Sequence, residues 1–287
     1  MSVERRDANF GDCAAWLYGP AGPGPHPCVV MAHGFSLTRH DALPQYAEAF
    51  AEAGFATLVF DYRHLGDSGG DAGRFRVSEQ RRDWRDAIAH ARALPNVDAE
   101  RIVLWGYSFG GGHVVEAAAA DSRIAAVLAL MPFLDGLPRV LKNPLGQTTW
   151  IVPRAIADRL GRRVRVPATA PPHEHGAMAL PGEFDGFRQS VGPGSSWRNE
   201  IGPGLFLTVA FFRPVANASK LRMPVWFGLG ERDISVSPSA IRKAAARAQN
   251  AELTTYPTYD HFGGLHGDGP ALVAADQLAF LRKVGLG

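Results

Sequence analysis

Short apolar runs alternate with longer amphipathic stretches along most of the chain. The run Cys28–Ala32 is apolar throughout, as expected of a strand that is covered on both faces. Glu79–Leu94 is strongly charged, and its apolar residues recur at helical spacing. Gly54 follows the amphipathic stretch Pro44–Ala53, a position typical of a left-handed helix C-cap. The repeated change of period predicts strands that alternate with helices.

This alternation predicts an α/β fold with a mostly parallel central sheet and helices on both of its faces, because parallel strands need helical crossovers. The chain opens with an expected antiparallel hairpin. The expected strands are Val3–Arg6, Cys13–Tyr18, Cys28–Ala32, Phe55–Phe60, Ile102–Trp105, Ile124–Met131, Met223–Gly228 and Leu253–Tyr256. The expected helices outside the middle of the chain are Pro44–Ala53, Glu79–Leu94, Gly112–Ala120, Pro238–Ala248 and Ala271–Val284.

The middle of the chain has a different texture. Pro and Gly recur every few residues between 133 and 217, and only Pro153–Leu160 has the pattern of a helix. Because regular elements resume at Met223, we interpret 133–217 as an insertion into one domain whose core is formed by 1–132 and 218–287. The insertion is rich in large apolar residues, namely Phe133, Leu134, Trp150, Ile151, Phe184, Phe187, Trp197, Phe206, Phe211 and Phe212.

Composition narrows the class of protein. The 287 residues are 46% hydrophobic and 20% charged, which is typical of a globular chain, and 30 basic against 28 acidic residues give a net charge of +2. Near-neutrality argues against nucleic acid or an anionic membrane as the main partner. The N-terminus lacks the apolar stretch of a secretory signal, and no apolar run approaches the ~20 residues of a membrane span. We therefore expect a cytoplasmic protein whose two cysteines, Cys13 and Cys28, are core thiols.

One pentapeptide carries recognisable chemistry. Gly106-Tyr107-Ser108-Phe109-Gly110 follows the expected strand Ile102–Trp105 and precedes a helix, the context that makes G-x-S-x-G a nucleophile elbow. A strand that turns into a helix within so few residues strains the serine backbone, and the close packing leaves no room for side chains at the glycines. The turn holds the Ser108 hydroxyl above the sheet, next to a helix N-terminus that favours negative charge.

A serine nucleophile needs a base, and the base needs an orienting group. Carboxylates follow the strand that ends near Gly228, where Asp233 is favoured as the orienting acid and Glu231 is the alternative. A histidine follows the next strand, where His261 is favoured as the base and His266 competes with it. The carboxyl ends of parallel strands share one edge of the sheet, so these side chains are expected beside Ser108.

An oxyanion hole requires backbone N–H donors aimed at the tetrahedral oxygen. The N–H of Phe109, directly after the nucleophile, is one candidate donor. The N–H of Phe35, in the loop after Cys28–Ala32, is the other. His33 in the same loop is interpreted as a structural residue and not as a second base.

With these motifs the chain resembles the α/β-hydrolase superfamily, in the serine-hydrolase branch of carboxylesterases, dienelactone-hydrolase-like proteins and polyketide acyltransferase or thioesterase relatives. The resemblance rests on His33-Gly34-Phe35, Asp61-Tyr62-Arg63, Gly66-Asp67-Ser68, Gly106–Gly110, Gly230–Asp233 and His261-Phe262. It also favours Asp233, and it implies that the insertion forms a lid over the nucleophile. One departure is His64-Leu65, which stands between Arg63 and Gly66; we interpret His64 as a loop residue. Ser108 argues against relatives that use an aspartate nucleophile on epoxides or carbon–halogen bonds.

These features predict a serine hydrolase that acts on carboxylic esters or thioesters of a largely apolar small molecule. The alternatives are an acyltransferase or cyclase with the same triad and a non-water acceptor, and less favoured, a lyase or a non-catalytic binder. No cofactor is expected. His173-Glu174-His175 lacks a third ligand at helical spacing, which favours a loop over a metal site. A homodimer is left open.

Overall fold

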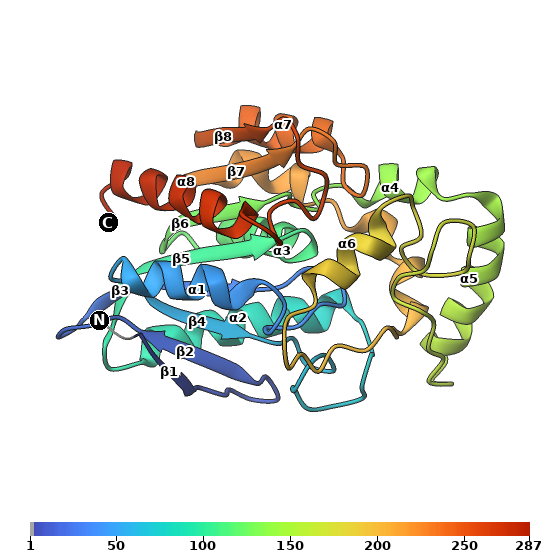
Figure 1. Ribbon diagram of the computed structural model, residues 1–287, viewed down its shortest axis with the longest axis horizontal. Coiled ribbons are helices and arrows are strands. Elements are labelled where there is room, and N and C mark those ends of the chain that lie inside the picture. Colours follow the sequence, from blue (N-terminus) through green and yellow to red (C-terminus); the bar gives the residue numbers. More distant parts are fainter. Residues whose placement is uncertain (1–2) are drawn as a thin grey trace.

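The computed structural model describes residues 3–287, so the first two residues of the expected core lie outside the described residues. Eight strands form one sheet in the order β1-β2-β4-β3-β5-β6-β7-β8 (Figure 1). The strands are β1 Glu4–Asp7, β2 Ala15–Gly19, β3 His26–Ala32, β4 Ala56–Phe60, β5 Val97–Tyr107, β6 Ile124–Leu130, β7 Pro224–Gly230 and β8 Asn250–Tyr256.

The sheet is mostly parallel, as the sequence predicts. Strands β3 to β8 run parallel to one another, whereas β2 pairs antiparallel with both β1 and β4. The central strand β5 lies between β3 and β6 and is buried from Ile102 to Tyr107. Its carboxyl end therefore opens in the middle of one edge of the sheet, where a crevice is available for a ligand.

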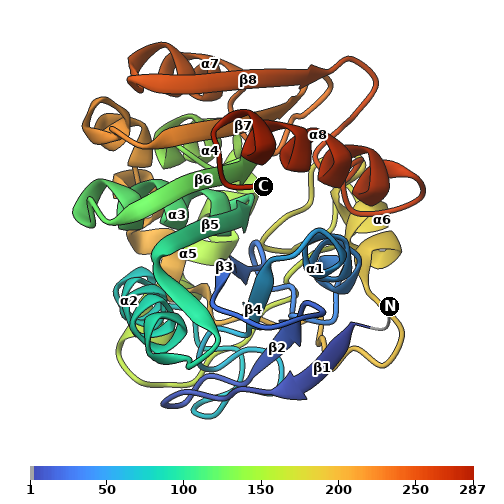
Figure 2. The same cartoon turned by 90° about the vertical axis from the view of Figure 1, so that its left-hand side faces the viewer.

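Helices cover both faces, and this part of the prediction is confirmed as well. Helices α1 and α8 lie on one face, and α2, α3 and α7 lie on the other (Figure 2). The Tyr46 ring of α1 packs on Trp105 at 4.9 Å, and the Trp84 ring of α2 packs on Phe60 at 5.2 Å between centroids. Gly54 ends α1 with φ +95°. These helices are α1 Leu43–Glu52, α2 Val77–Ala93, α3 Phe109–Ala120, α7 Pro238–Arg247 and α8 Gly269–Lys283.

The inserted stretch has more regular structure than its sequence pattern predicts. The expected helix at Pro153–Leu160 is present as the second half of a longer helix, but the expectation that it is the only helix of the insertion is wrong. The segment forms α4 Gly136–Lys142, α5 Leu145–Arg159, α6 Glu183–Ser190 and three 3₁₀ helices at Pro203–Leu207, Val209–Phe211 and Pro214–Lys220. Pro153 lies inside α5 and removes one hydrogen bond of the helix. The helix continues past it because Ile151 and Ala155, on either side of the proline, are buried in the molecule. Burial of an apolar stripe outweighs the local cost of the proline.

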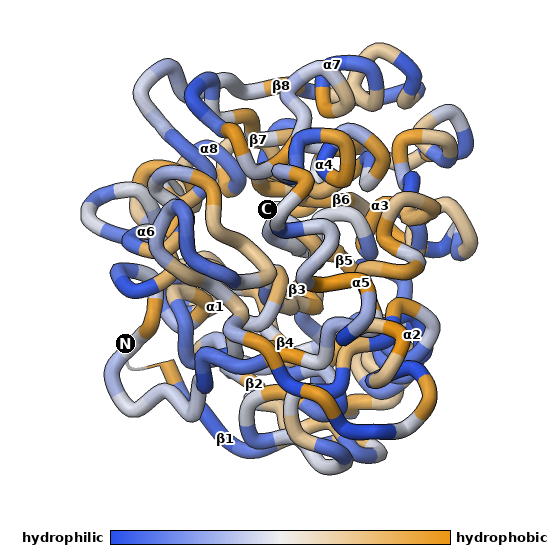
Figure 3. Tube along the Cα trace, turned by 90° about the vertical axis from the view of Figure 1, so that its right-hand side faces the viewer, coloured by the Kyte–Doolittle hydropathy of each residue, from blue (hydrophilic) through white to orange (hydrophobic). Residues whose placement is uncertain are grey.

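The inserted helices lie beyond one end of the sheet, the end to which the parallel strands point (Figure 1). Figure 3 views the molecule from this end, and hydrophobic and hydrophilic stretches alternate along the inserted chain. Cys13 and Cys28 are buried free thiols, and burial raises the pKa of Cys28 to about 12, which confirms them as core residues. Within residues 3–287, no helix combines the length and apolarity that crossing a bilayer demands.

Candidate active site

The turn between β5 and α3 places Ser108 in a strained conformation. Strand β5 ends at Tyr107 and α3 begins at Phe109, so Ser108 alone connects them. Its backbone has φ +54° and ψ −115°, a combination that side-chain-bearing residues rarely adopt. Strain of this kind costs about 1–3 kcal/mol and persists only where the surrounding structure enforces it.

The two glycines of the pentapeptide allow this turn to close. A Cβ atom added to Gly110 would lie 2.6 Å from the carbonyl oxygen of His33, and one added to Gly106 would collide with the carbonyl oxygen of Gly110. The backbone of Ser108 is fixed in turn, because its N–H donates to Leu130 at 3.0 Å. The expected elbow is therefore present, and its glycines are required by packing.

Three side chains from distant parts of the sequence meet at this edge of the sheet. The Ser108 hydroxyl lies 2.8 Å from Nε2 of His261, and Nδ1 of the same ring lies 2.7 Å from Oδ2 of Asp233. All three residues are buried, with relative exposures of 7%, 3% and 5%. The geometry is that of a hydroxyl that can pass its proton to an imidazole held by a carboxylate.

The carboxylate is fixed on its far side as well. Oδ1 of Asp233 accepts the N–H groups of Ser235 at 2.9 Å and Val236 at 3.0 Å. Glu231, the alternative acid, points away and pairs with Arg242 at 2.5 Å in an exposed position. The structure therefore brings Asp233, and not Glu231, to the imidazole.

The histidine is held by its backbone. The Tyr107 hydroxyl donates to the carbonyl oxygen of His261 at 3.0 Å, and the two rings lie 5.1 Å apart. His266, the competing histidine, lies farther along the same loop, and its ring makes no hydrogen bond within residues 3–287. The loop thus presents His261 to Ser108.

Two backbone donors beside Ser108 have no partner in the described chain. Phe109 is the first residue of α3, so its N–H has no acceptor within the helix. The N–H of Phe35 likewise has no acceptor among residues 3–287. Both residues line the same pocket as Ser108 and His261.

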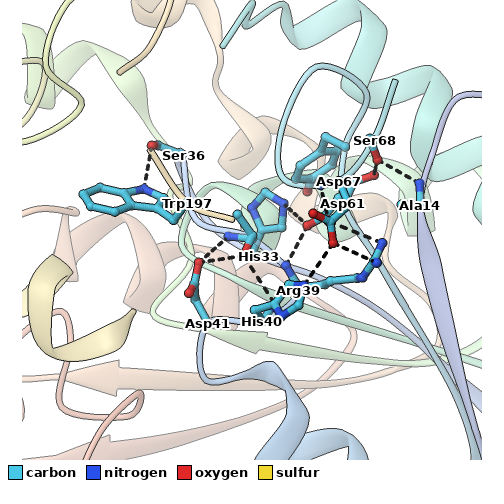
Figure 4. A network of polar contacts seen from close by, with 12 residues as sticks. Ala14, His33, Ser36, Arg39, His40, Asp41, Asp61, Asp67, Ser68 and Trp197 are labelled. Carbon is cyan, nitrogen blue, oxygen red and sulfur yellow. Dashed lines mark hydrogen bonds and ion pairs between the residues drawn. The ribbon is translucent and has the colours of Figure 1, made fainter. Parts of the chain in front are cut away.

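A buried polar network supports the loop that carries Phe35 (Figure 4). Oδ1 of Asp61 accepts the N–H of Arg39 at 2.6 Å, and Oδ2 accepts the N–H of Asp67 at 3.1 Å. The Arg39 guanidinium lies 3.5 Å from Asp61 and donates to Asp67 at 3.0 Å. Burial raises the pKa of Asp61 to about 7, although the Arg39 charge opposes this shift.

His33 belongs to this network, as expected of a structural residue. Its Nδ1 lies 2.8 Å from the carbonyl oxygen of Gly34, and its Nε2 faces Asp61 at 3.6 Å (Figure 4). Burial lowers the pKa of His33 to about 4, so the ring is neutral near pH 7. It supports the loop and does not face Ser108.

The inserted segment is bonded to this same loop. The indole N–H of Trp197 donates to the Ser36 hydroxyl at 3.1 Å (Figure 4). The backbone N–H of Gly192 donates to Asp41 at 3.0 Å, and the Asp41 carboxylate in turn accepts the Thr38 N–H at 2.7 Å. The position of Phe35 therefore depends on contacts between the core and the insertion.

A narrow pocket opens at the Ser108 hydroxyl. Its volume is about 50 Å³. Besides Ser108 and His261, its walls are mainly apolar and come from the core and from the insertion: Phe133, Val140, Met178, Leu205, Phe206 and Val236. Such a lining suits an apolar group of a ligand.

Other histidines singled out in the sequence lie elsewhere. Nδ1 of His64 accepts the Asp71 N–H at 2.8 Å, and its Nε2 faces Glu79 at 3.4 Å, so His64 is a residue of its own loop. The His175 ring stacks on Trp150 at 4.7 Å. Across residues 3–287, no three His, Cys, Asp or Glu side chains gather as metal ligands would.

Sequence reasoning missed two charged residues near the pocket. Arg139 lines it, and Glu183, which is 1% exposed, lies 3.4 Å from Arg139 and accepts the Ser235 hydroxyl at 2.8 Å. Both residues lie in the irregular insertion, where no periodicity or motif marks them. A buried charge within an otherwise Pro- and Gly-rich segment has no signature in the sequence.

Comparison with known proteins assigns the family. The sequence model of the family described as serine aminopeptidase S33 matches residues 23–263. The chain belongs to this α/β-hydrolase family. The residues matched by the family model include the strained serine turn, the carboxylate loop and His261. The resemblance inferred from the motifs is therefore confirmed.

Relatives of this α/β-hydrolase include proteins named as a thiohydrolase and a polyketide transferase. It is 36% identical over 286 residues to the quorum-quenching protein AidA of Acinetobacter baumannii, covering 97% of this chain and 93% of the relative. Shorter matches are to the thiohydrolase aneE of Aspergillus aculeatus (35% identical, 38% of this chain, 35% of the relative) and the polyketide transferase grgF of Penicillium sp. (34%, 42% and 40%). These names support a hydrolase or an acyltransferase.

Solved structures agree with the fold of this α/β-hydrolase. The structure of DcsB in complex with its substrate analogue superposes with a TM-score of 0.83 at 25% sequence identity, and the match covers 100% of both chains. The likeness extends through the inserted segment as well as the sheet.

Proposed function

We propose that the protein is a serine hydrolase that cleaves carboxylic esters or thioesters of largely apolar small molecules through an acyl-enzyme on Ser108. The observation that supports this most strongly is the unbroken chain of hydrogen bonds from the Ser108 hydroxyl through His261 to Asp233 at an apolar pocket. The family and the names of the relatives support the same class of chemistry.

In the first half of the reaction, the Ser108 oxygen attacks the acyl carbon while Nε2 of His261 takes the hydroxyl proton. The bond to the alcohol or thiol then breaks, and the leaving group receives that proton from His261. Asp233 holds the Nδ1–H tautomer of the ring and stabilises its cationic form. In the second half, water attacks the acyl-enzyme through the same base and releases the acid.

The oxyanion of each tetrahedral intermediate needs donors that are free before the reaction begins. We assign this role to the N–H groups of Phe35 and Phe109, which line the pocket and have no acceptor of their own in the described chain. Donors that are already in place need no reorganisation during the reaction, and each contributes about 10²–10³ in rate in comparable sites.

The insertion 133–217 takes the role of a lid on a core formed by 1–132 and 218–287. Its residues Val140, Met178 and Phe206 form part of the pocket wall. Its Trp197 and Gly192 are bonded to the loop that carries Phe35. A lid of this kind keeps water away from the serine and strengthens the dipoles of the oxyanion hole.

The test is hydrolysis of p-nitrophenyl esters and acyl thioesters of rising chain length by the wild-type protein and by Ser108→Ala. We expect saturable turnover that the substitution abolishes while the circular dichroism spectrum is unchanged. Turnover retained by Ser108→Ala would reject the assignment. Because the full-length relative is named a quorum-quenching protein, loss of a quorum signal from a reporter culture is a further readout.

An acyltransferase is the second candidate, because one relative is named a polyketide transferase. The acyl-enzyme would then react with an alcohol or amine and not with water. Product analysis with and without a competing alcohol separates the two. Free acid as the only product at high alcohol concentration favours the hydrolase, whereas a dominant transfer product favours the transferase.

A further inference from the structure

The insertion lines a second, partly open cavity next to the pocket at Ser108. It has a volume of about 300 Å³, six times that of the inner pocket, and its lining comes from the insertion, with Ile151, Ala179 and Leu180 among its apolar members. The inner pocket, at about 50 Å³, is far smaller than sites for drug-sized ligands, which span about 300–1,000 Å³. The inner pocket alone is too small for such a ligand, whereas the two cavities together have the size of a substrate site.

The two cavities meet at three residues that line both, Arg139, Asn143 and Ala177. The Arg139 guanidinium donates to the side-chain oxygen of Asn143, so this pair of side chains forms part of the partition between them. Both residues lie at the C-terminal end of α4 and just after it. Arg139 and Asn143 therefore stand at the boundary between the two cavities.

The guanidinium is held at NH1, which donates to Asn143, but its other two nitrogens are less well satisfied. Its NH2 group lies 3.4–3.5 Å from the Glu183 carboxylate, and its Nε has no acceptor within residues 3–287. Glu183 has closer donors, the N–H of Leu180 and the hydroxyl of Ser235, both at 2.8 Å. Arg139 thus keeps hydrogen-bond donors for another acceptor, although its side chain is only 12% exposed.

We propose that Arg139 is the specificity-determining residue of an extended substrate site, and that this site takes an acyl chain long enough to reach the outer cavity and carrying an uncharged oxygen, a hydroxyl or carbonyl, at the level of Arg139. This rests on the proposed function. We expect the oxygen to be uncharged because Glu183 already balances the charge of the guanidinium. A carboxylate on the substrate would be repelled by the Glu183 carboxylate.

The experiment compares kcat/KM for p-nitrophenyl octanoate, for a set of octanoates that carry one hydroxyl group at successive carbons, and for the monoester of the corresponding dicarboxylic acid. Wild-type protein is compared with Arg139→Ala. Arg154→Ala is the matched control, because Arg154 is an exposed arginine of the insertion that lines neither cavity.

We expect the wild type to prefer at least one hydroxyoctanoate over octanoate by about tenfold or more, the effect of a hydrogen bond from a charged donor. Arg139→Ala loses this preference, mainly through KM, and favours longer unsubstituted chains because the partition is gone. Arg154→Ala keeps the wild-type ratios. A merely structural role of Arg139 would lower all rates together and leave the ratios unchanged, which would overturn the proposal.

Two further outcomes also overturn it: a wild-type preference for the dicarboxylic monoester, and an Arg139→Ala protein with the wild-type hydroxyoctanoate preference. If Arg139→Ala does not fold, Arg139→Lys, which keeps the charge but loses the planar fork, must reduce the preference. p-Nitrophenyl acetate is added as a substrate too short to reach the outer cavity. If the proposed function fails, the wild-type protein cleaves none of the esters, this one included, and that result is distinct from failure of the specificity proposal.

Discussion

Replacing Asp233 by asparagine exchanges one acceptor oxygen for an NH2 group and leaves the shape of the side chain almost unchanged. Oδ1 accepts two backbone N–H groups, from Ser235 at 2.9 Å and Val236 at 3.0 Å, while Oδ2 lies 2.7 Å from Nδ1 of His261. The amide oxygen must stay at the two N–H donors, because an NH2 group there would face them donor to donor. The NH2 group therefore points at His261.

An NH2 donor at Nδ1 selects the tautomer whose proton is on Nε2. Nε2 is the atom that must accept the proton of Ser108, 2.8 Å away, so the general base is lost while the fold is kept. The equivalent substitution in serine proteases lowers kcat by about 10⁴, which corresponds to about 5.5 kcal/mol. We expect Asp233→Asn to lower kcat for p-nitrophenyl acetate by about this factor, with Tm within a few degrees of the wild type.

The matched control is Glu231→Gln, an acid-to-amide change of an exposed residue in the same loop that is paired with Arg242. Its kcat is expected to stay within about twofold of the wild-type value, as for surface substitutions generally. Stopped assays with high enzyme concentration measure both variants. An Asp233→Asn protein with a tenth or more of wild-type kcat, or an equal loss in Glu231→Gln, would refute the reasoning.

Three further predictions concern packing, acid stability and the loop. Gly110→Ala puts a Cβ 2.6 Å from the His33 carbonyl oxygen and should lower the free energy of unfolding, measured by urea titration, by about 1–3 kcal/mol. Gly146→Ala is the control, because a Cβ there meets no atom within 4 Å, and it should leave the free energy of unfolding unchanged. Equal effects of the two substitutions would contradict this explanation. Burial lowers the pKa of His113 from 6.5 to about 3, so below pH 6.5 the unfolded state binds a proton that the folded state does not, and stability is lost as pH falls. Between pH 7.5 and 5, the free energy of unfolding of His113→Gln should therefore fall by about 2 kcal/mol less than that of the wild type. An equal fall in both proteins would show that His113 is not the source of the acid sensitivity. Trp197→Phe removes the hydrogen bond to Ser36 and should lower kcat about 2- to 12-fold at unchanged Tm; an unaltered kcat would show that the loop holds its position without it.

Much of the core could be predicted from the sequence, because buried parallel strands need unbroken apolar runs. Cys28–Ala32 reads as such a run, and it is part of β3. Boundaries were less accurate. Helix α3 begins at Phe109 and not at Gly112, because the glycines that weaken a helix by propensity are required here by close packing.

The insertion shows where sequence patterns fail. Helices α4 and α6 are short and α5 contains Pro153, so the spacing of proline and glycine hides all three. Ser108 and His261 were recognisable because a motif or a loop after a strand marks each of them. Arg139 and Glu183 were not, since their pairing depends on the path of α4 and α6 across the insertion.

The central claim is that the Ser108 hydroxyl is an activated nucleophile, and covalent labelling tests it most directly. Wild-type protein is treated with a fluorophosphonate probe, and the modified peptide is identified by mass spectrometry. We expect one adduct per chain, on Ser108, absent from Ser108→Ala and formed much more slowly in Asp233→Asn. A wild-type protein that stays unlabelled, or one labelled at another residue while Ser108 remains free, would contradict it.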